Sequence, residues 1–227
     1  MNSAYILRIA AIAIAALQMV YIYVLPGGQT GSTSEWSNGV ATISAGSSPK
    51  ALLWSALGII FYALLMKLRP FAPREGVPAW WRRAVAFVLD FQFGLITLSG
   101  LFALIPLAIE AARTGRFAWN YERHYTVMTD VVIGIPMAFI SMGALFLYFV
   151  FPLTRGRQTF GCFVTGIKVT PPFGNEGRFT WRAAVRRIIY EGRALCGGRW
   201  KRDADGNMRH DLETGSRVVL VDYRRLP

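Results

Sequence analysis

The sequence predicts an α-helical integral membrane protein with four transmembrane helices and a small, basic, cytoplasmic C-terminal α/β region. The chain is 53% hydrophobic and only 17% charged, and its mean hydropathy is +0.35, whereas about a quarter of the residues of an ordinary soluble domain are charged. Its net charge is +12. An apolar and basic composition is typical of membrane proteins with cationic cytoplasmic loops. Because no nucleic-acid-binding motif accompanies the charge, no nucleic-acid partner is expected.

Four apolar segments approach or exceed the roughly 20 residues that a spanning helix needs. They are residues 4–25, 51–68, 81–109 and 131–153. A cleavable signal peptide is the alternative for the first segment. Its apolar core of about 17 residues is longer than that of most signal peptides, and no small-x-small cleavage site follows it. We therefore expect a retained helix.

The distribution of lysine and arginine predicts the orientation of the four segments. The first loop, residues 26–50, has Lys50 as its only basic residue, whereas fifteen lysines or arginines follow from Arg155 onward. The second loop is also basic, and its cations are Lys67, Arg69, Arg74, Arg82 and Arg83. The positive-inside rule then places both termini in the cytoplasm and the first and third loops outside. The third loop follows the rule least closely, since it has three arginines of its own.

The first loop is rich in glycine, serine and threonine. Two interpretations are open for it: a flexible linker, or an exposed loop that contacts another molecule. The composition favours the flexible linker.

The C-terminal region, residues 155–227, contains short structured segments. Residues 167–170 are rich in β-branched side chains, and the sequence RVVLVDY, residues 217–223, predicts a short terminal strand. Thr180 is a plausible N-cap for a helix that begins at Trp181. Apolar residues of this helix form one stripe: Trp181, Ala184, Val185, Ile188 and Ile189. Its other positions include Arg182, Arg186, Arg187 and Arg193.

Two placements are open for this basic helix. It can lie flat on the membrane with its apolar stripe down and its arginines among anionic lipid headgroups. Alternatively, it can pack on the spanning helices with its arginines paired to carboxylates. The basic face favours the first placement, so anionic lipid is an expected partner.

Asp90 lies inside the third apolar segment, seven residues after Arg83. The two residues share a helix face, with Asp90 about 10 Å deeper. Since an unpaired charge near the centre of the membrane costs about 2.5–3.5 kcal/mol, Asp90 should be protonated, hydrogen-bonded or paired with a cation. A direct bond to Arg83 is too long for this short side chain. Arg155, Arg157 and Arg182 are the candidate partners, and Asp211 is expected to pair with another arginine of this set.

Three motifs of the sequence resemble the RDD family of bacterial membrane proteins, which is named for one arginine and two aspartates. The first, RRAVAFVLD, supplies Arg83 and Asp90. The second, GRQTFGCFVTGIKV, supplies Gly156, Gln158, Thr159, Gly161 and Gly166. The third, RHDLETGSRVV, supplies His210, Asp211 as the second aspartate, and Gly215.

The resemblance covers about residues 81–219 and implies two regions in a bacterial cytoplasmic (inner) membrane protein. Residues 79–227 would be the RDD-like region, with two transmembrane helices and a cytoplasmic tail from residue 155. Residues 1–78 would add two transmembrane helices and the external loop. The chain departs from the family pattern, because many members have a further hydrophobic helix before the second aspartate. Here residues 188–209 are too polar to span a membrane.

Two functions remain open. The first is a non-catalytic accessory or assembly subunit of a larger membrane complex, in which Asp90 and Asp211 fasten the cytoplasmic region to the helices. The second is an ion or small-solute transporter, to which the family resemblance points, with Asp90 as an intramembrane relay. Small residues that permit close helix packing, with a partner or within the chain, are Gly94, Ser99, Gly100, Gly134, Ser141, Gly143 and Ala144.

An enzyme is not expected, because the sequence has none of the common hydrolase, metalloprotease or nucleotide-binding motifs. His124 and His210 are the only histidines, too few and too far apart to predict a metal site. No cofactor is expected. In a cytoplasmic region, Cys162 and Cys196 should be free thiols.

Overall fold

The structure is a computed structural model that describes residues 3–23, 31–37, 40–68, 73–74, 78–125, 131–171, 178–196 and 208–221. The chain forms two compact units. One unit comprises Met1–Ala16, Tyr62–Gln92 and Leu147–Pro227, and the other comprises Leu17–Phe61 and Phe93–Phe146. Each unit combines helical segments with one three-stranded antiparallel sheet.

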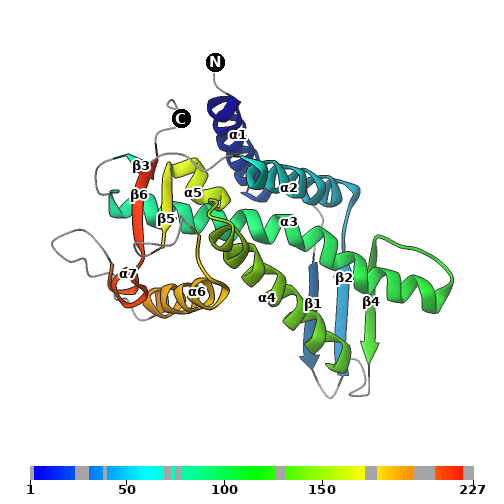
Figure 1. Ribbon diagram of the computed structural model, residues 1–227. Coiled ribbons are helices and arrows are strands. Elements are labelled where there is room, and N and C mark those ends of the chain that lie inside the picture. Colours follow the sequence, from blue (N-terminus) through cyan, green and yellow to red (C-terminus); the bar gives the residue numbers. More distant parts are fainter. Residues whose placement is uncertain are drawn as a thin grey trace. The chain divides into compact units, whose positions relative to one another are not determined.

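Four long helices occupy the predicted apolar segments (Figure 1). They are α1 (Ser3–Tyr23), α2 (Pro49–Lys67), α3 (Trp80–Thr114) and α4 (Val131–Thr154). Within the described residues, α2 and α3 are long and apolar enough to cross a membrane by length and composition. The stretches Tyr5–Gln18 and Phe139–Thr154 are apolar but shorter. The structure is therefore mostly helical with two candidate spans, and spanning by all four helices stays a prediction.

The long helices expose large apolar side chains, as helices in contact with lipid do. Examples are Leu53 at 60%, Val88 at 55% and Phe139 at 72% exposure. In the second unit, α2 and α3 approach closely at Gly100, where a β-carbon would lie 2.8 Å from the carbonyl oxygen of Ala51. Gly100 thus serves packing within the chain, whereas a β-carbon on Gly143 would meet no atom within 4 Å.

The first loop folds into a β-hairpin, so the expectation of a flexible linker is wrong. Strand β1 (Gly31–Ser37) pairs with β2 (Val40–Gly46), and β2 pairs with β4 (Asn120–Tyr125) of the third loop. The dipeptide Asn38–Gly39 between β1 and β2 is a strong hairpin signal that the loop's composition obscured. Strands from the first and third loops therefore belong to one sheet.

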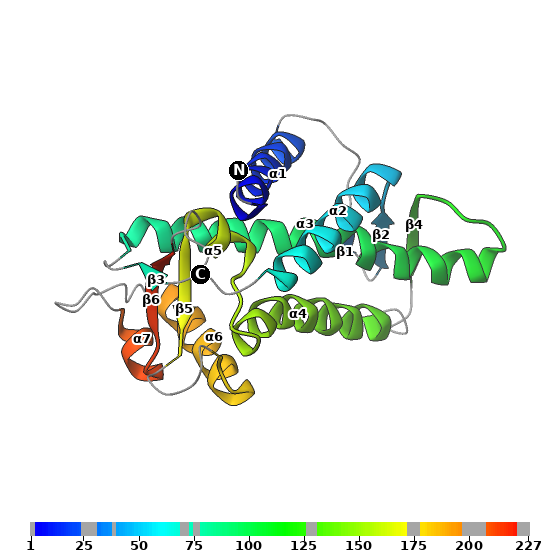
Figure 2. The ribbon, with the colours of Figure 1, turned by 45° about the horizontal axis from the view of Figure 1, so that its top comes forward.

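The other unit contains the sheet β3–β6–β5 and three short helices (Figure 2). Its strands are β3 (Pro73–Arg74), β5 (Ile167–Thr170) and β6 (Arg217–Val221), and its helices are α5 (Phe160–Thr165), α6 (Trp181–Cys196) and α7 (Arg209–Thr214). The predicted start of α6 is correct: the Ala183 N–H donates to the Thr180 hydroxyl at 3.3 Å. The strand predicted from Arg217 forms as β6, and the β-branched residues 167–170 form β5. A small apolar core of Ala86, Ile167 and Val218 joins α3 to this sheet.

Candidate functional site

Asp90 lies on α3 and is 3% exposed. Its carboxylate accepts three hydrogen bonds: from the Tyr148 hydroxyl at 2.7 Å, the Thr159 hydroxyl at 2.5 Å and the Gly161 N–H at 2.6 Å. Asp90 was expected to be protonated, hydrogen-bonded or paired with a cation, and in the structure it is hydrogen-bonded to neighbouring groups. The expected pairing with Arg155, Arg157 or Arg182 is wrong.

Gly161 reaches Asp90 because α5 packs directly on the backbone of α3. A β-carbon at Gly161 would lie 1.9 Å from the carbonyl oxygen of Ala86, a distance that no side chain tolerates. Tyr148 is fixed in turn by two contacts. Its hydroxyl accepts the Phe160 N–H at 3.2 Å, and its carbonyl accepts the Tyr62 hydroxyl at 3.3 Å. The chain around Asp90 is therefore held from α2, α4 and α5 together.

Asp211 forms a second buried centre, on α7, and is fully buried. Arg83 donates from Nη1 to one carboxylate oxygen, and Arg187 donates from Nη1 to the other at 2.6 Å. The Met208 N–H also donates to Asp211, at 3.0 Å, where the carboxylate stabilises the start of α7. One carboxylate thus joins α3, α6 and α7.

Arg187 does not face lipid, which corrects the prediction for that residue. It is 1% exposed and donates to Ser216 as well as to Asp211. It lies three residues after Ala184, which is fully buried, so it belongs to the packed face of α6 rather than to the outer face. A buried guanidinium needs a partner carboxylate, and Asp211 provides it. Arg182, Arg186 and Arg193 are exposed.

The other arginines expected to bind carboxylates have different contacts. Arg157 donates from Nη1 to the carbonyl oxygen of Leu68 at the end of α2. The guanidinium of Arg155 is exposed and lies 5.1 Å from the ring centroid of Phe151. Neither therefore contributes to the pairing of Asp90 or Asp211.

Three glycines of the second and third motifs adopt left-handed backbone conformations, and the motif glutamine binds a backbone carbonyl. Gly166 adopts a left-handed conformation, φ 71°, and ends α5 with its N–H bonded to the Phe163 carbonyl, a position that glycine fills at no steric cost. Gly156 and Gly215 also have positive φ, at 65° and 66°. Gln158 donates to the Ile167 carbonyl at 2.6 Å, which ties the segment before α5 to β5. The side chain of His210 is not among the side chains that the structure describes.

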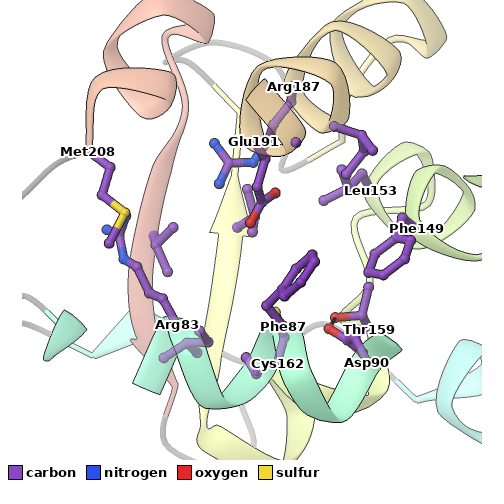
Figure 3. Close-up of a pocket in the computed structure, with 16 residues that line it drawn as sticks. Arg83, Phe87, Asp90, Phe149, Leu153, Thr159, Cys162, Arg187, Glu191 and Met208 are labelled. Carbon is purple, nitrogen blue, oxygen red and sulfur yellow. Dashed lines mark hydrogen bonds between the residues drawn. The ribbon is translucent and has the colours of Figure 1, made fainter. Parts of the chain in front are cut away.

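A cavity of about 150 Å³ lies beside the two centres (Figure 3). Its polar lining comes from Arg83, Asp90, Thr159, Arg187 and Glu191, and most of the remaining wall is apolar. In Figure 3, Arg83 lies on one side of the cavity and Asp90 on the other, with Arg187 and Glu191 on α6 above them.

Sequence reasoning did not identify Tyr148, Glu191, Met208 or Ser216 as members of the site. Two of them had a usable signal: Tyr148 is the single tyrosine in the apolar segment 131–153, and Ser216 lies in the third motif next to Gly215. Glu191 and Met208 become members through tertiary contacts between distant parts of the chain.

Burial shifts the pKa of two groups near the cavity, outside the long helices. Burial raises the pKa of the Cys162 thiol, and the charge of Asp90 adds to the increase. Burial lowers the pKa of Lys168, and the nearby guanidinium of Arg157 adds to that effect. The Cys162 thiol is therefore protonated at neutral pH and is a poor nucleophile. The described residues contain no group of three or more histidine, cysteine, aspartate or glutamate side chains that could hold a metal ion.

Comparison with known protein families identifies the RDD family. The model of the RDD family matches residues 77–198, a range that includes Arg83, Asp90 and the glycine–threonine–glycine segment. No curated protein and no solved structure matches the chain. Since the matched range ends before Asp211, the assignment of this residue as the second family aspartate stays a prediction.

Proposed function

The chain belongs to the RDD family, a family of membrane proteins, and from this premise we propose that it is a non-catalytic accessory or assembly subunit of a larger membrane complex. One observation carries the proposal: both buried carboxylates are used for contacts within the chain. Asp90 accepts three hydrogen bonds, and Asp211 is held by two guanidinium groups and one N–H. A relay group must instead exchange its proton or cation with a pathway.

In this proposal the protein crosses the cytoplasmic membrane of a bacterium four times, with both termini in the cytoplasm. The 21 residues of α1 and the 24 residues of α4 correspond to about 32 and 36 Å, enough for the hydrocarbon core. The pairing of β2 with β4 supports the orientation, because the positive-inside rule assigns their two loops to the same side.

Two exposed surfaces support the proposed partners. On α6, Arg182, Arg186 and Arg193 are exposed beside Trp181, at 51%, and Ile189, at 45%. This combination suits anionic lipid headgroups.

On α4, Phe139, Ile140 and Met142 are exposed at 72%, 53% and 69% next to the uncrowded Gly143. A small residue among exposed apolar side chains suits a helix of another subunit.

The deciding experiment is extraction of the native protein in a mild detergent, followed by mass spectrometry of what co-purifies. We expect partners in stoichiometric amounts. A clean monomer that conducts ions in liposomes would overturn the proposal.

The second candidate function, transport of an ion or small solute, has one supporting observation: Asp90 lines a cavity together with Glu191. Asp90→Asn separates the two functions, because asparagine keeps a carbonyl oxygen for the Gly161 and Tyr148 donors but cannot carry a charge. A subunit with this change should keep its partners. A transporter should keep its fold and lose flux.

A further inference from the structure

Lys168 is a buried lysine on the face of β5 that lies opposite the cavity. Its strand neighbours Ile167 and Val169 both line the cavity, and successive side chains of a strand lie on opposite faces of the sheet. Lys168 is 7% exposed. Lysine is almost never buried to this extent without a partner, so the surroundings of this side chain bear on its role.

The described part of the chain does not neutralise the Lys168 ammonium group. The group takes part in no hydrogen bond and no ion pair with the described residues. Its nitrogen atom is also not among the polar atoms that are closed to solvent, unlike the Nε atoms of Arg83 and Arg187. A small anion can therefore reach it. An ammonium group has three N–H donors and binds negatively charged oxygen atoms strongly.

Two further cations lie around the turn that follows α4. The Gln158 amide donates, at 2.6 Å, to the carbonyl of the residue before Lys168, which joins this turn to the start of β5. The carbonyl of Leu153 accepts, at 3.1 Å, the N–H of the residue after Arg178. Arg157 belongs to the turn itself. Three basic side chains thus come from segments that hydrogen bonds hold together.

The charges of Arg157, Lys168 and Arg178 act on one another. Burial lowers the pKa of Lys168, and the guanidinium group of Arg157 lowers it further. Burial also lowers the pKa of Arg157, and the charge of Arg178 adds to that effect. No carboxylate of the described residues counters either shift. Because like charges repel one another, an anion would stabilise this cluster.

Both arginines have donors available for such an anion. Arg157 uses Nη1 for the carbonyl of Leu68, and its other donors bind no acceptor in the described part of the chain. Arg178 is exposed and has no hydrogen bond or ion pair with the described residues. A guanidinium group presents five N–H donors in a planar fork, which matches the oxygen atoms of a phosphate group.

The cluster also lies where two apolar helices end. α2 is long and apolar enough to cross a membrane, and it ends directly before Leu68, whose carbonyl binds Arg157. α4 ends shortly before Arg157. The ends of spanning helices lie at the level of the lipid headgroups, so lipid phosphate groups would surround the cluster if α2 crosses the membrane.

We propose that Arg157, Lys168 and Arg178 bind a phosphate group, with the Lys168 ammonium group at its buried side and the two guanidinium groups toward solvent. An anionic phospholipid or a soluble phosphate could supply this group. The site is separate from the exposed basic face of α6. It goes beyond the proposed subunit function and does not depend on it.

Dioctanoyl phosphatidic acid is a suitable probe, because its phosphate group is unsubstituted and its short chains enter detergent micelles. Isothermal titration calorimetry of the full-length protein in a non-ionic detergent should give saturable binding with one site per chain. Dioctanoyl phosphatidylcholine has the same chains, but its choline group offsets the charge of its phosphate. It should bind at least about tenfold more weakly. Equal binding of the two lipids would overturn the proposal.

Lys168→Met tests the location, because methionine has a similar length and no charge. It should weaken phosphatidic acid binding at least about tenfold. The unfolding midpoint of the ligand-free variant should stay the same or rise, since a buried charge without a partner is removed. Unchanged binding would show that the proposed site is wrong. A marked fall of the midpoint would indicate that Lys168 has a partner within the chain, and would overturn the proposal as well.

Lys50→Met is the matched control. It removes the same charge from an exposed lysine at the other end of α2, so it should leave the binding of phosphatidic acid unchanged. If Lys50→Met weakens binding as much as Lys168→Met, the net charge of the chain attracts the lipid and the proposed site is wrong.

The source of the phosphate group follows from a titration with inorganic phosphate under the same conditions. If inorganic phosphate binds with an affinity similar to that of phosphatidic acid, and Lys168→Met weakens both, the site recognises a soluble phosphate. If phosphatidic acid binds and inorganic phosphate does not, a lipid headgroup is the ligand. Absence of saturable binding for both probes would overturn the proposal.

Discussion

The Gly161 N–H donates to the Asp90 carboxylate at 2.6 Å across 71 positions of sequence, and a β-carbon at Gly161 would collide with the backbone of Ala86. The hydrogen bond therefore depends on the close approach of α5 to α3, and that approach depends on glycine at position 161. A carboxylate inside an apolar helix is stabilised by a backbone amide that only glycine could bring so near.

Gly161→Ala should destabilise the protein by about 3 kcal/mol or more, because the added methyl group must displace α5 from α3 and weaken the bond to Asp90. Thermal unfolding in detergent measures the change. Gly192→Ala is the control: it adds the same methyl group to a helix where no atom lies within 4 Å, so it should be neutral or stabilising by up to about 1 kcal/mol. Equal effects of the two changes would contradict the close approach.

Asp90→Ala should be far more harmful than Asp90→Asn. Alanine leaves the hydroxyls of Tyr148 and Thr159 and the Gly161 N–H without their acceptor, at about 1–3 kcal/mol for each donor that stays buried. Asparagine keeps one oxygen, and the Thr159 hydroxyl can turn to accept from its amide. Yield and unfolding midpoint of the purified variants measure the difference. An Asn variant as unstable as the Ala variant would indicate that the negative charge itself is required.

Arg187→Leu should lower the stability of the protein strongly, whereas Arg186→Leu should hardly change it, although the two residues are neighbours on α6. Loss of Arg187 removes a buried guanidinium group that holds the fully buried Asp211, which should cost about 3 kcal/mol. Loss of the exposed Arg186 should change stability by no more than about 0.5 kcal/mol. Arg187→Lys should recover part of the loss, because it restores the charge without the second hydrogen bond. The unfolding midpoint in detergent again provides the comparison.

Cys162 should react slowly with thiol reagents. Its raised pKa, caused first by burial and then by the charge of Asp90, means that less thiolate is present at any given pH than for an ordinary cysteine. In a Cys196→Ser background, alkylation by iodoacetamide at pH 8 should be at least about tenfold slower than for a free cysteine peptide. The rate should rise as the pH increases above the ordinary cysteine pKa. Labelling in denaturant provides the control, and rapid labelling of the folded protein would show that the thiol is accessible.

Local patterns predicted local structure well. The Thr180 cap fixed the start of α6, and the apolar segments located all four long helices to within a few residues. The first loop was misjudged because its composition outweighed the Asn38–Gly39 hairpin signal, and because its sheet depends on β4 from a distant loop.

The partners of the motif residues could not be predicted, because they depend on how distant segments pack. Arg187 looks like its exposed neighbours in sequence, and only the position of Asp211 identifies it as buried. Asp90 meets donors that lie 58 to 71 positions further along the chain. The carboxylate was correctly predicted to need a partner, but the sequence suggested cations, whereas hydroxyl groups and a backbone amide serve that purpose.

The ladder between β2 and β4 also imposes an order on biosynthesis. A ribosome completes β1 and β2 first, and the whole of α2 and α3 must follow before β4 is made. Until then, the edge of β2 that β4 will cover has unpaired backbone groups, which invite pairing with other chains. If α3 inserts into a membrane, its insertion would be the step that delivers β4 to this edge, so a delay in insertion would leave the nascent protein open to aggregation at the edge of β2.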